Sequence, residues 1–258
     1  MFDLHSHLLP GVDDGAKTPE QSAAVLARFA QQGVAGVCLT PHLLASAAAA
    51  GMPAAHVAAW EALRPLAPTG IVLYRGAEVM LDRPLDERVA RDRAVTLNGT
   101  RYLLVEFPRA VASGTVTQAL TRVLEVGLVP VVAHPERYAC CSPHTVRQWR
   151  ALGALMQVDG PTLLSPRSRG VRARELVEHG LADIGAGDNH GDERGLKEVW
   201  DEFHGQAGGG LVAQLLFRKN PESLLADEVP APVPPFSFRI PMLDIVRGLF
   251  GGRSAERS

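Results

Sequence analysis

Residues 128–137 read LVPVVAHPER, six mostly apolar residues followed by a polar and charged group. A near-continuous apolar run of this length is typical of a parallel β-strand that is covered on both faces. His134 and Arg137 then lie just beyond the carboxyl end of that strand. Their position becomes informative if other strands of the chain end in the same way.

Six further apolar runs are spaced along the chain, at residues 2–4, 35–40, 71–76, 102–107, 155–158 and 183–187. Stretches with a helical spacing of Ala, Leu and Val lie between them, for example at 19–32, 115–126, 142–152 and 171–180. Thr18 and Gln21 form a capping-box pattern around Pro19, which marks a helix start. About seven apolar strands that alternate with helices predict a parallel α/β sheet, buried on both faces.

The composition sets limits on the class of protein. The chain of 258 residues is long enough for one well-buried α/β domain. Its net charge of −2 and lack of a long Lys/Arg run argue against a nucleic-acid partner. The three cysteines lack framework spacing, and we find neither a signal peptide nor an apolar run of membrane-spanning length. We therefore expect a cytoplasmic protein that is not integral to the membrane.

The composition shifts near the end of the chain, where residues 230–235 are rich in proline. We expect residues 1–229 to form the α/β domain, and residues 230–258 to form a Pro-rich linker and a short tail. Residues 236–252 place apolar side chains at a helical spacing. They are either a helix that docks on a neighbouring subunit or on a membrane-associated partner, or a segment that packs on the core. The sequence leaves homo-oligomerisation open.

Nine side chains that are able to bind metal ions fall at or just beyond the carboxyl ends of six of the apolar runs. They are His5, His7, Asp14, His42, Glu78, Glu106, His134, Asp188 and His190. In a barrel of parallel strands these ends face one rim, where active sites are built. His5 and His7 also point to the same side of their strand, because side chains alternate with a period of two. The repetition predicts a metal centre.

The types of ligand narrow the chemistry. Imidazole with carboxylate suits Zn, Mn or Fe, and the absence of thiolates disfavours a structural zinc site. Five histidines and four carboxylates exceed the needs of one ion, so we expect two or three divalent ions. Clustered ions of this kind are typical of phosphoryl hydrolysis. Arg137 is the first candidate for binding a substrate phosphate, because a guanidinium binds phosphate oxygens bidentately, and Arg194 is the second.

The motifs H-S-H with D-D-G, T-P-H, G-A-E, V-E-F-P, A-H-P-E-R-Y and G-D-N-H follow one another in this order. In this combination the chain resembles the PHP (polymerase and histidinol phosphatase) superfamily. It is most similar to the branch of metal-dependent protein-tyrosine phosphatases of bacterial capsular polysaccharide synthesis. The resemblance covers residues 1–226, including N-P-E-S-L-L near their end.

The resemblance implies a distorted seven-stranded (β/α) barrel of the TIM type with a trinuclear site, commonly of manganese. One ion would be held by His5, His7, Glu78 and Asp188, a second by Glu78, Glu106 and His134, and a third by Asp14, His42 and His190. Arg137 matches the phosphate-contacting arginine of the family. Arg194 lies one residue away from the place of a second arginine. The implied activity is a protein-tyrosine phosphatase, whose partner is an autophosphorylating bacterial tyrosine kinase of exopolysaccharide export.

Two alternatives share the same metal site. The first is a small-molecule phosphatase of the histidinol-phosphate kind, which a narrower pocket would favour. The second is a metal-stabilised binding module, which would take up metal tightly without turnover. The sequence does not separate them from the tyrosine phosphatase, because it does not show the shape of the pocket.

Two other mechanisms fit the sequence less well. Cys141 and Arg147 have the C-x5-R spacing of thiol phosphatases, but Pro143 removes a backbone donor from the loop that must wrap the phosphate. An amidohydrolase would bridge its metals with a carboxylated lysine. None of the three lysines, Lys17, Lys197 and Lys219, lies at the end of a central strand.

Overall fold

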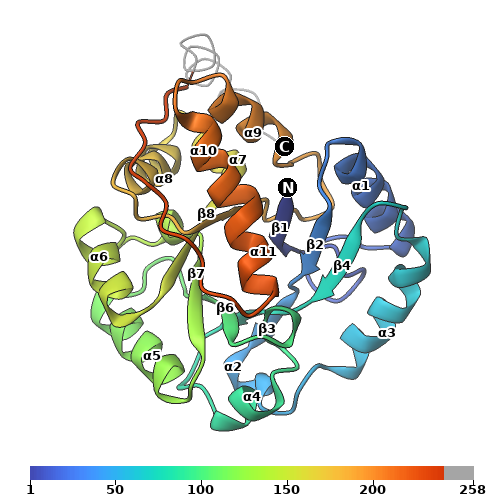
Figure 1. Ribbon diagram of the computed structural model, residues 1–258. Helices are drawn as coiled ribbons and strands as arrows, with labels where there is room; N and C mark the ends of the chain where they lie inside the picture. The colour runs from blue at the N-terminus through green and yellow to red at the C-terminus, as the bar shows by residue number, and fades with distance from the viewer. Residues whose placement is uncertain (241–258) are drawn as a thin grey trace, which may run out of the picture.

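The computed structural model describes residues 1–240 as a ring of parallel strands surrounded by helices (Figure 1). The strands are β1 (Phe2–Ser6), β2 (Gly36–Leu39), β3 (His42–Leu44), β4 (Val72–Arg75), β5 (Glu78–Met80), β6 (Tyr102–Glu106), β7 (Val129–Ala133), β8 (Leu155–Asp159) and β9 (Ile184–Ala186). The α-helices are α1 (Pro19–Gln31), α2 (Ala45–Ala48), α3 (Ala54–Leu63), α4 (Glu87–Asp92), α5 (Ser113–Glu125), α6 (Pro143–Leu152), α7 (Gly160–Leu163), α8 (Ser168–Glu178), α9 (Lys197–His204), α10 (Gly209–Gln214) and α11 (Asn220–Leu225). Short turns η1 (Arg64–Leu66), η2 (Leu97–Gly99), η3 (Pro135–Arg137) and η4 (Leu215–Lys219) complete the described elements.

The strands form two parallel sheets, with the orders β1-β2-β4 and β3-β5-β6-β7-β8-β9. The chain runs directly from β2 into β3 and from β4 into β5, so these two pairs each occupy one position of the ring. The ring closes where β1 meets the chain after β9: the N–H of Asp188 donates to the carbonyl of His5 (2.9 Å), and the N–H of His7 to that of Asn189 (2.8 Å). The described strands therefore make a closed, distorted barrel with seven positions, as predicted.

Each of the seven apolar runs forms a strand within a residue or two of its predicted bounds. The sequence analysis missed β3 and β5, which continue β2 and β4 after a break in the pairing. Pro41 has no N–H to donate, and Gly76 and Ala77 form the corresponding break before β5. Helix α1 begins at Pro19 as predicted, and the Thr18 hydroxyl accepts the N–H of Gln21 (3.2 Å).

The amino end of the barrel is closed by a helical segment. Helices α10 and α11, joined by η4, cross in front of the strands in the view of Figure 1. Leu224 and Leu225 of α11 pack with the apolar side chains inside the barrel, among them Leu4, Leu104 and Val131. The carboxyl end of the barrel is consequently the end available for a site, and the outer helices pack their apolar faces against the strands.

The segment that we expected to be a linker runs along the barrel as far as residue 240 (Figure 1). Val233 and Phe238 are each only 5% exposed, and the Phe238 ring lies 4.4 Å from that of Phe203. Asn220 exchanges two hydrogen bonds with the backbone of Ala231 (2.8 and 3.0 Å). The apolar positions expected for the tail at Leu243, Val246, Leu249 and Phe250 lie outside the described residues. No helix within residues 1–240 combines the length and the hydropathy needed to cross a membrane.

Candidate metal centre

The structure brings all nine predicted side chains together at the carboxyl end of the barrel. A cavity of about 410 Å³ opens there, and most of them line it directly. Their ligand atoms fall into four overlapping groups in which all atoms lie within 4.8 Å of one another: His7, Asp14, His42 and His190; His5, Glu78 and His134; His5, His7 and Asp188; and His42, Glu78 and Glu106. The side chains that the strand-end argument singled out thus lie together in space.

Glu78, the first residue of β5, lies at the centre of these groups. Its side chain is fully buried, and four imidazoles surround the carboxylate. Glu78 Oε1 lies 3.0 Å from His134 Nε2 and 3.3 Å from His5 Nε2. Oε2 lies 3.0 Å from His42 Nδ1 and 3.4 Å from His7 Nε2. Neither oxygen accepts a well-formed hydrogen bond from any described residue.

Such an arrangement fits cations rather than hydrogen bonds. Leaving both oxygens of a buried carboxylate without partners costs several kcal/mol, on the order of 2–7 for each unpaired polar group. Asp188 Oδ1, which is also buried and unpaired, lies 3.3 Å from the Nε2 atoms of both His5 and His7. Those two Nε2 atoms are themselves 3.2 Å apart. Nitrogen and oxygen atoms that converge in this way without well-formed hydrogen bonds between them are the donor set of a metal centre.

The ring nitrogens that face away from the centre are held by hydrogen bonds. His5 Nδ1 lies 2.9 Å from Gln157 Oε1, and His7 Nδ1 lies 2.8 Å from Asp13 Oδ2. Such contacts place the proton on Nδ1 and leave Nε2 free to ligate. The sequence analysis singled out neither Gln157 nor Asp13. Gln157 lies near the carboxyl end of β8, so the same strand-end argument could have found it. Nothing in the motif D-D-G distinguishes the roles of Asp13 and Asp14.

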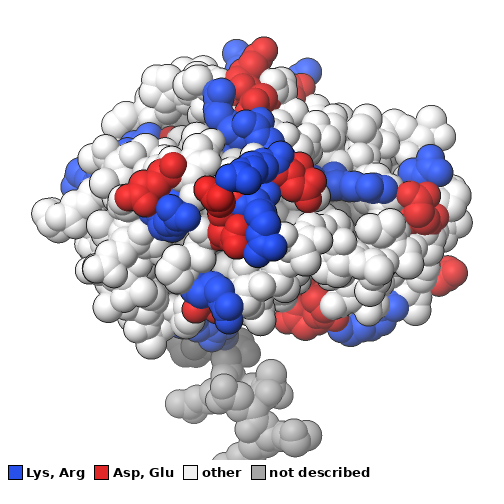
Figure 2. Space-filling view, turned by 90° about the horizontal axis from the view of Figure 1, so that it is seen from below, with Lys and Arg blue, Asp and Glu red and all other residues white. Residues whose placement is uncertain are grey.

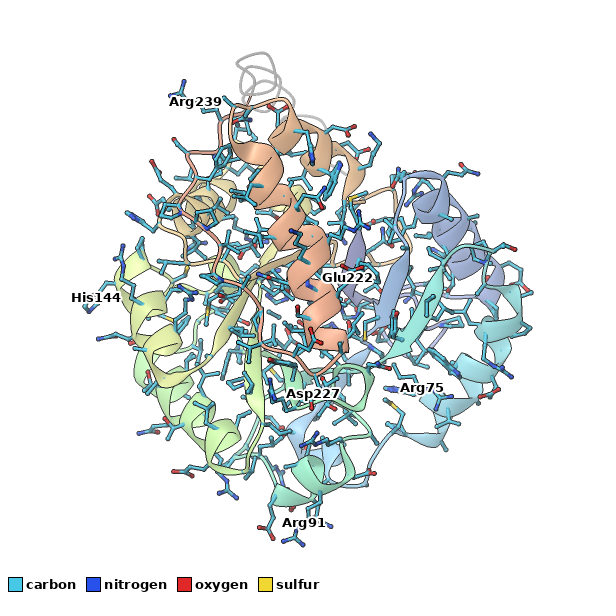
Figure 3. All side chains as sticks on the ribbon, viewed as in Figure 1. Arg75, Arg91, His144, Glu222, Asp227 and Arg239 are labelled. Carbon is cyan, nitrogen blue, oxygen red and sulfur yellow. The ribbon has the colours of Figure 1, made fainter. Side chains whose placement is uncertain are left out.

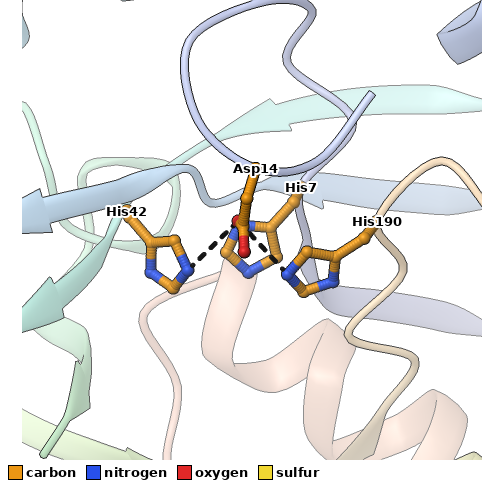
Figure 4. A group of neighbouring side chains, drawn as sticks. All are labelled: His7, Asp14, His42 and His190. Carbon is orange, nitrogen blue, oxygen red and sulfur yellow. Dashed lines mark ion pairs between the residues drawn. The ribbon is translucent and has the colours of Figure 1, made fainter. Parts of the chain in front are cut away.

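Four of the side chains form the outer part of the site (Figure 4). Asp14 Oδ1 lies 3.5 Å from the Nε2 atoms of both His42 and His190. The His190 ring stacks on that of His7, with 4.1 Å between the centroids. Because the Asp14 side chain is 70% exposed, this group forms the mouth of the cavity, whereas Glu78 forms its floor.

Backbone geometry contributes to this convergence. His134 and Asp188 both adopt left-handed backbone conformations, with φ of 33° and 46°, which few residues other than glycine do. Each lies directly after a strand or one residue beyond it, so the sharp turn directs its side chain back over the barrel. Gly15 allows the loop that carries Asp14 to approach His7, because a Cβ at Gly15 would lie 1.9 Å from the His7 carbonyl oxygen.

The ionisable groups shift one another strongly in the absence of an ion. Burial disfavours protonation of His5, but the carboxylates of Glu78 and Asp188 outweigh it and raise the pKa of His5 to about 9. His42 is likewise partly buried, and contacts with Glu106 and Glu78 raise its pKa to about 10. Burial acts to raise the pKa of Glu78, but the surrounding imidazoles hold it well below its usual value. Protonated histidines therefore neutralise the carboxylates when no metal does.

Both predicted arginines lie at the cavity. Arg137 of η3 donates through Nη2 to Asp159 Oδ2 (2.9 Å) and also to Asp188 Oδ2. Arg194 Nε donates to Asp192 (2.8 Å), and its Nη2 lies 3.2 Å from His190 Nδ1. Two further arginines that the sequence analysis did not single out, Arg109 and Arg169, line the same cavity.

Cys141 lies outside the cavity lining, directly before Ser142, the N-cap residue of α6. Burial, with a smaller contribution from the Glu136 carboxylate, raises the pKa of the Cys141 thiol to about 12. A thiol with such a pKa holds almost no thiolate at neutral pH, so it is a poor nucleophile. This geometry leaves the thiol mechanism without support.

A parallel barrel with this donor set at the carboxyl end of its strands belongs to the class of metal-dependent barrel hydrolases. Within that class, the chain is a member of the CpsB/CapC family of capsular polysaccharide synthesis, whose model matches residues 1–226. The match includes every candidate ligand and both predicted arginines.

Curated relatives agree with this membership. The chain is 29% identical over 249 residues to the tyrosine-protein phosphatase CpsB of Streptococcus pneumoniae, covering 89% of this chain and all of that protein. It is 28% identical over 196 residues to the tyrosine-protein phosphatase YwqE of Bacillus subtilis, covering 74% and 77%.

Solved structures agree on the fold. A structure from the work on YwqE of B. subtilis and CpsB of S. pneumoniae, described as unique metal-dependent tyrosine phosphatases, superposes with a TM-score of 0.76 at 24% identity. It covers 92% of this chain and 99% of the other. The lactonase Lmo2620 of Listeria monocytogenes has a TM-score of 0.52 at 14% identity, covering 88% and 95%. These two structures support the barrel architecture alone.

Proposed function

We propose that this protein is a metal-dependent tyrosine-protein phosphatase of capsule or exopolysaccharide synthesis. The observation that carries the proposal is the fully buried Glu78, whose unpaired carboxylate oxygens face four imidazoles at the cavity floor. Membership of the CpsB/CapC family and the names of the relatives support the substrate class. The substrate would be a phosphotyrosine protein, and we infer an autophosphorylating tyrosine kinase in the cytoplasm.

The nine side chains would hold two or three divalent ions, for which we propose manganese. Glu78 has one oxygen toward the His5–His134 side and the other toward His42, so both of its oxygens would serve as donors to the bound ions. The outer group of His7, Asp14, His42 and His190 supplies a further set of donors. When bound, such ions polarise phosphoryl oxygens and lower the pKa of water.

Arg137 would bind the phosphate of the substrate. Its guanidinium is anchored by Asp159 and Asp188, and the side chain remains 20% exposed toward the cavity. These two ion pairs fix the orientation of the planar guanidinium group, so its remaining N–H groups are preorganised for phosphoryl oxygens. Arg194 lines the same cavity near His190 and would contact the same phosphate.

The walls of the cavity suit an aromatic phosphate ester. Phe107 and Tyr138 line it together with the charged groups, and their rings are 5.9 Å apart in an edge-to-face arrangement. The Tyr138 hydroxyl donates to the carbonyl of Ala133 (2.8 Å) and accepts the N–H of Phe107 (3.2 Å), so its ring position is fixed. Only 3% of Phe107 and 1% of Tyr138 is exposed, so these side chains would offer a substrate phenyl ring a small, rigid apolar contact beside the metal donors.

The proposal is tested by activity after chelation and metal add-back. The purified protein is stripped of metal and assayed with a phosphotyrosine peptide, the matching phosphoserine peptide and histidinol phosphate, with Mn, Zn or Fe added. We expect turnover only with metal, fastest for phosphotyrosine and with manganese. Glu78→Gln, which retains the shape of the side chain but removes its charge, should lose both bound metal and turnover.

Three results would refute the proposal. Full activity of the chelated protein would exclude metal dependence. Faster turnover of histidinol phosphate than of the peptide would identify a small-molecule phosphatase. Tight metal binding without turnover of any of the three substrates would identify a binding module.

A further inference from the structure

The four arginines that line the cavity differ in their partners. Arg137 and Arg194 are each paired with carboxylates. The guanidinium groups of Arg109 and Arg169 form neither an ion pair nor a hydrogen bond with any residue among 1–240. Unpaired guanidinium groups at a cavity that is already a candidate phosphate site point to an additional anionic ligand.

The positions of these arginines follow from the strand order. Arg109 lies in the loop after β6, Arg137 in η3 after β7, and Arg169 in the first turn of α8, after β8. β7 lies between β6 and β8 in the sheet (Figure 1), so the strands that precede Arg109 and Arg169 flank the strand that precedes Arg137. Two strand spacings separate their strands by about 10 Å. A ligand that reaches either arginine would lie beside the phosphate held at Arg137.

The segments that carry the two arginines are fixed to the same stretch of backbone. The N–H of Ala139 donates to the carbonyl of Arg109 (2.7 Å). Arg172, one turn after Arg169 on α8, donates to the carbonyl of Tyr138 (3.3 Å). The arginine side of the cavity is therefore preorganised, and binding there would require ordering of the side chains alone.

The charges in this part of the cavity are not balanced. Burial lowers the pKa of Arg169, and so do the nearby positive charges of Arg109, Arg137 and Arg172, with Asp159 opposing them. The carboxylates of the cavity belong to the candidate metal ligands or to Arg137, so bound cations would leave the flanking arginines uncompensated. A cleft lined by one sign of charge attracts ligands of the opposite sign.

We propose that Arg109 and Arg169 form a second anion-binding subsite, which binds an acidic side chain or a second phosphate flanking the phosphotyrosine of the substrate. The inference rests on the proposed function and deepens it, since it assigns the basis of the choice among phosphotyrosine proteins. Each charge-assisted contact should favour anionic flanks about tenfold in kcat/KM, the amount that corresponds to a hydrogen bond to a charged group.

A second arginine-rich surface provides the control. A groove beside α4 is lined by Arg83, Arg88, Arg91 and Arg122, together with Asp86 and Glu87. Figure 2 shows the face that carries α4, where basic and acidic side chains are intermixed. Arg91, labelled at the lower edge of Figure 3, forms an i,i+4 ion pair with Glu87 (2.7 Å). This arginine is paired with a carboxylate and does not line the cavity of the metal centre, so Arg91→Gln is the matched control variant.

The test compares three phosphotyrosine peptides of equal length, with neutral flanks, glutamate flanks or a second phosphotyrosine. The metal-loaded wild type should prefer anionic flanks. Arg109→Gln and Arg169→Gln should each reduce that preference about tenfold, whereas Arg91→Gln should leave it unchanged. If the arginine variants lose the preference for the glutamate-flanked peptide, the subsite recognises carboxylates. If they lose only the preference for the diphosphorylated peptide, the subsite recognises phosphate. Equal losses on neutral and anionic peptides, or no loss on either, would overturn the subsite.

A binding measurement separates this inference from the proposed function. The same peptides carrying a non-hydrolysable difluoromethylphosphonate are titrated by fluorescence anisotropy into the manganese-loaded protein and its variants. An arginine-dependent preference without turnover by the wild type would support the subsite and refute the phosphatase. Turnover without any charge preference in rate or binding would support the phosphatase and refute the subsite. The preference should also weaken as salt is raised, because exposed guanidinium groups are screened.

Discussion

Removing the metal should make the stability of the protein depend on pH in a specific direction. In the metal-free protein His5 is held between Glu78 and Asp188, and its pKa is about 9 instead of the ordinary 6.5. A group whose pKa is raised in the folded state contributes stability that is fully present below the unfolded value. That contribution is lost as the pH rises through the folded value. The window for the metal-free protein is therefore pH 6.5 to 9.

The size of the effect follows from the shift. A difference of about 2.5 pKa units corresponds to about 3 kcal/mol of unfolding free energy. The depressed pKa of Glu78 describes the same interaction, so it is not added. The pKa of His42 is also raised, but its side chain is 38% exposed, and solvent screening reduces its contribution to the unfolding free energy. For a chain of this size, about 3 kcal/mol corresponds to a melting temperature about 6–12 °C lower.

The assay is a set of thermal melts of the chelated and the manganese-loaded protein between pH 6 and 10. The difference between the two melting temperatures should widen from pH 6.5 to 9, because bound cations neutralise Glu78 whatever the state of His5. Replacing His5 with asparagine should flatten the curve of the chelated protein. His144→Ala, which removes an exposed imidazole of α6 labelled in Figure 3, should not. A chelated protein whose melting temperature is constant over this range, or falls in parallel with that of the loaded one, would refute the reasoning.

Four substitutions test the remaining assignments. His134→Ala should lose both bound metal and turnover, and retention of the full metal content would remove His134 from the ligand set. Arg137→Ala should retain its metal but lose about 100-fold or more in kcat, the effect of removing one preorganised charge contact; a change in KM alone would contradict that role. Cys141→Ser should remain active, and the wild type should react slowly with iodoacetamide at pH 7, because burial raises the thiol pKa to about 12; an inactive serine variant would revive the thiol mechanism. Phe238→Ala should lose about 3 kcal/mol of unfolding free energy, since the ring is buried against Phe203; no loss would mean that the segment after residue 229 does not stabilise the barrel.

The strands were predictable because their signal is local. A parallel strand covered on both faces must be apolar along its length, and seven such runs stand out from the polar segments around them. The extensions β3 and β5 gave no signal, since each is three residues long and begins with the candidate ligand His42 or Glu78. Their strand geometry depends on pairing with each other and with β6, which is a property of the assembled ring.

The candidate ligands were predictable for a different reason. The topology of a parallel barrel carries every strand end to one rim, so position along the chain is translated directly into position in space. Arg109 and Arg169 escaped notice because an arginine in a loop or at a helix start is usually a solvated surface charge. Whether such a long side chain faces the cavity depends on how the loop returns to the barrel. The spacing of residues does not encode that path.

Closure of the barrel and assembly of the metal centre depend on the same contacts. The hydrogen bonds that join β1 to the chain after β9 involve His5 and Asp188, both candidate ligands. Asp3 reinforces the junction, because its Oδ1 accepts the N–H groups of His5 (3.2 Å) and Gly187 (2.9 Å). A Cβ at Gly187 would lie 2.4 Å from Asp3 Oδ2, so a larger residue there would displace the Asp3 carboxylate that joins the two segments. Ions held between His5 and Asp188 would therefore link two segments more than 180 residues apart, which couples metal binding to folding of the barrel.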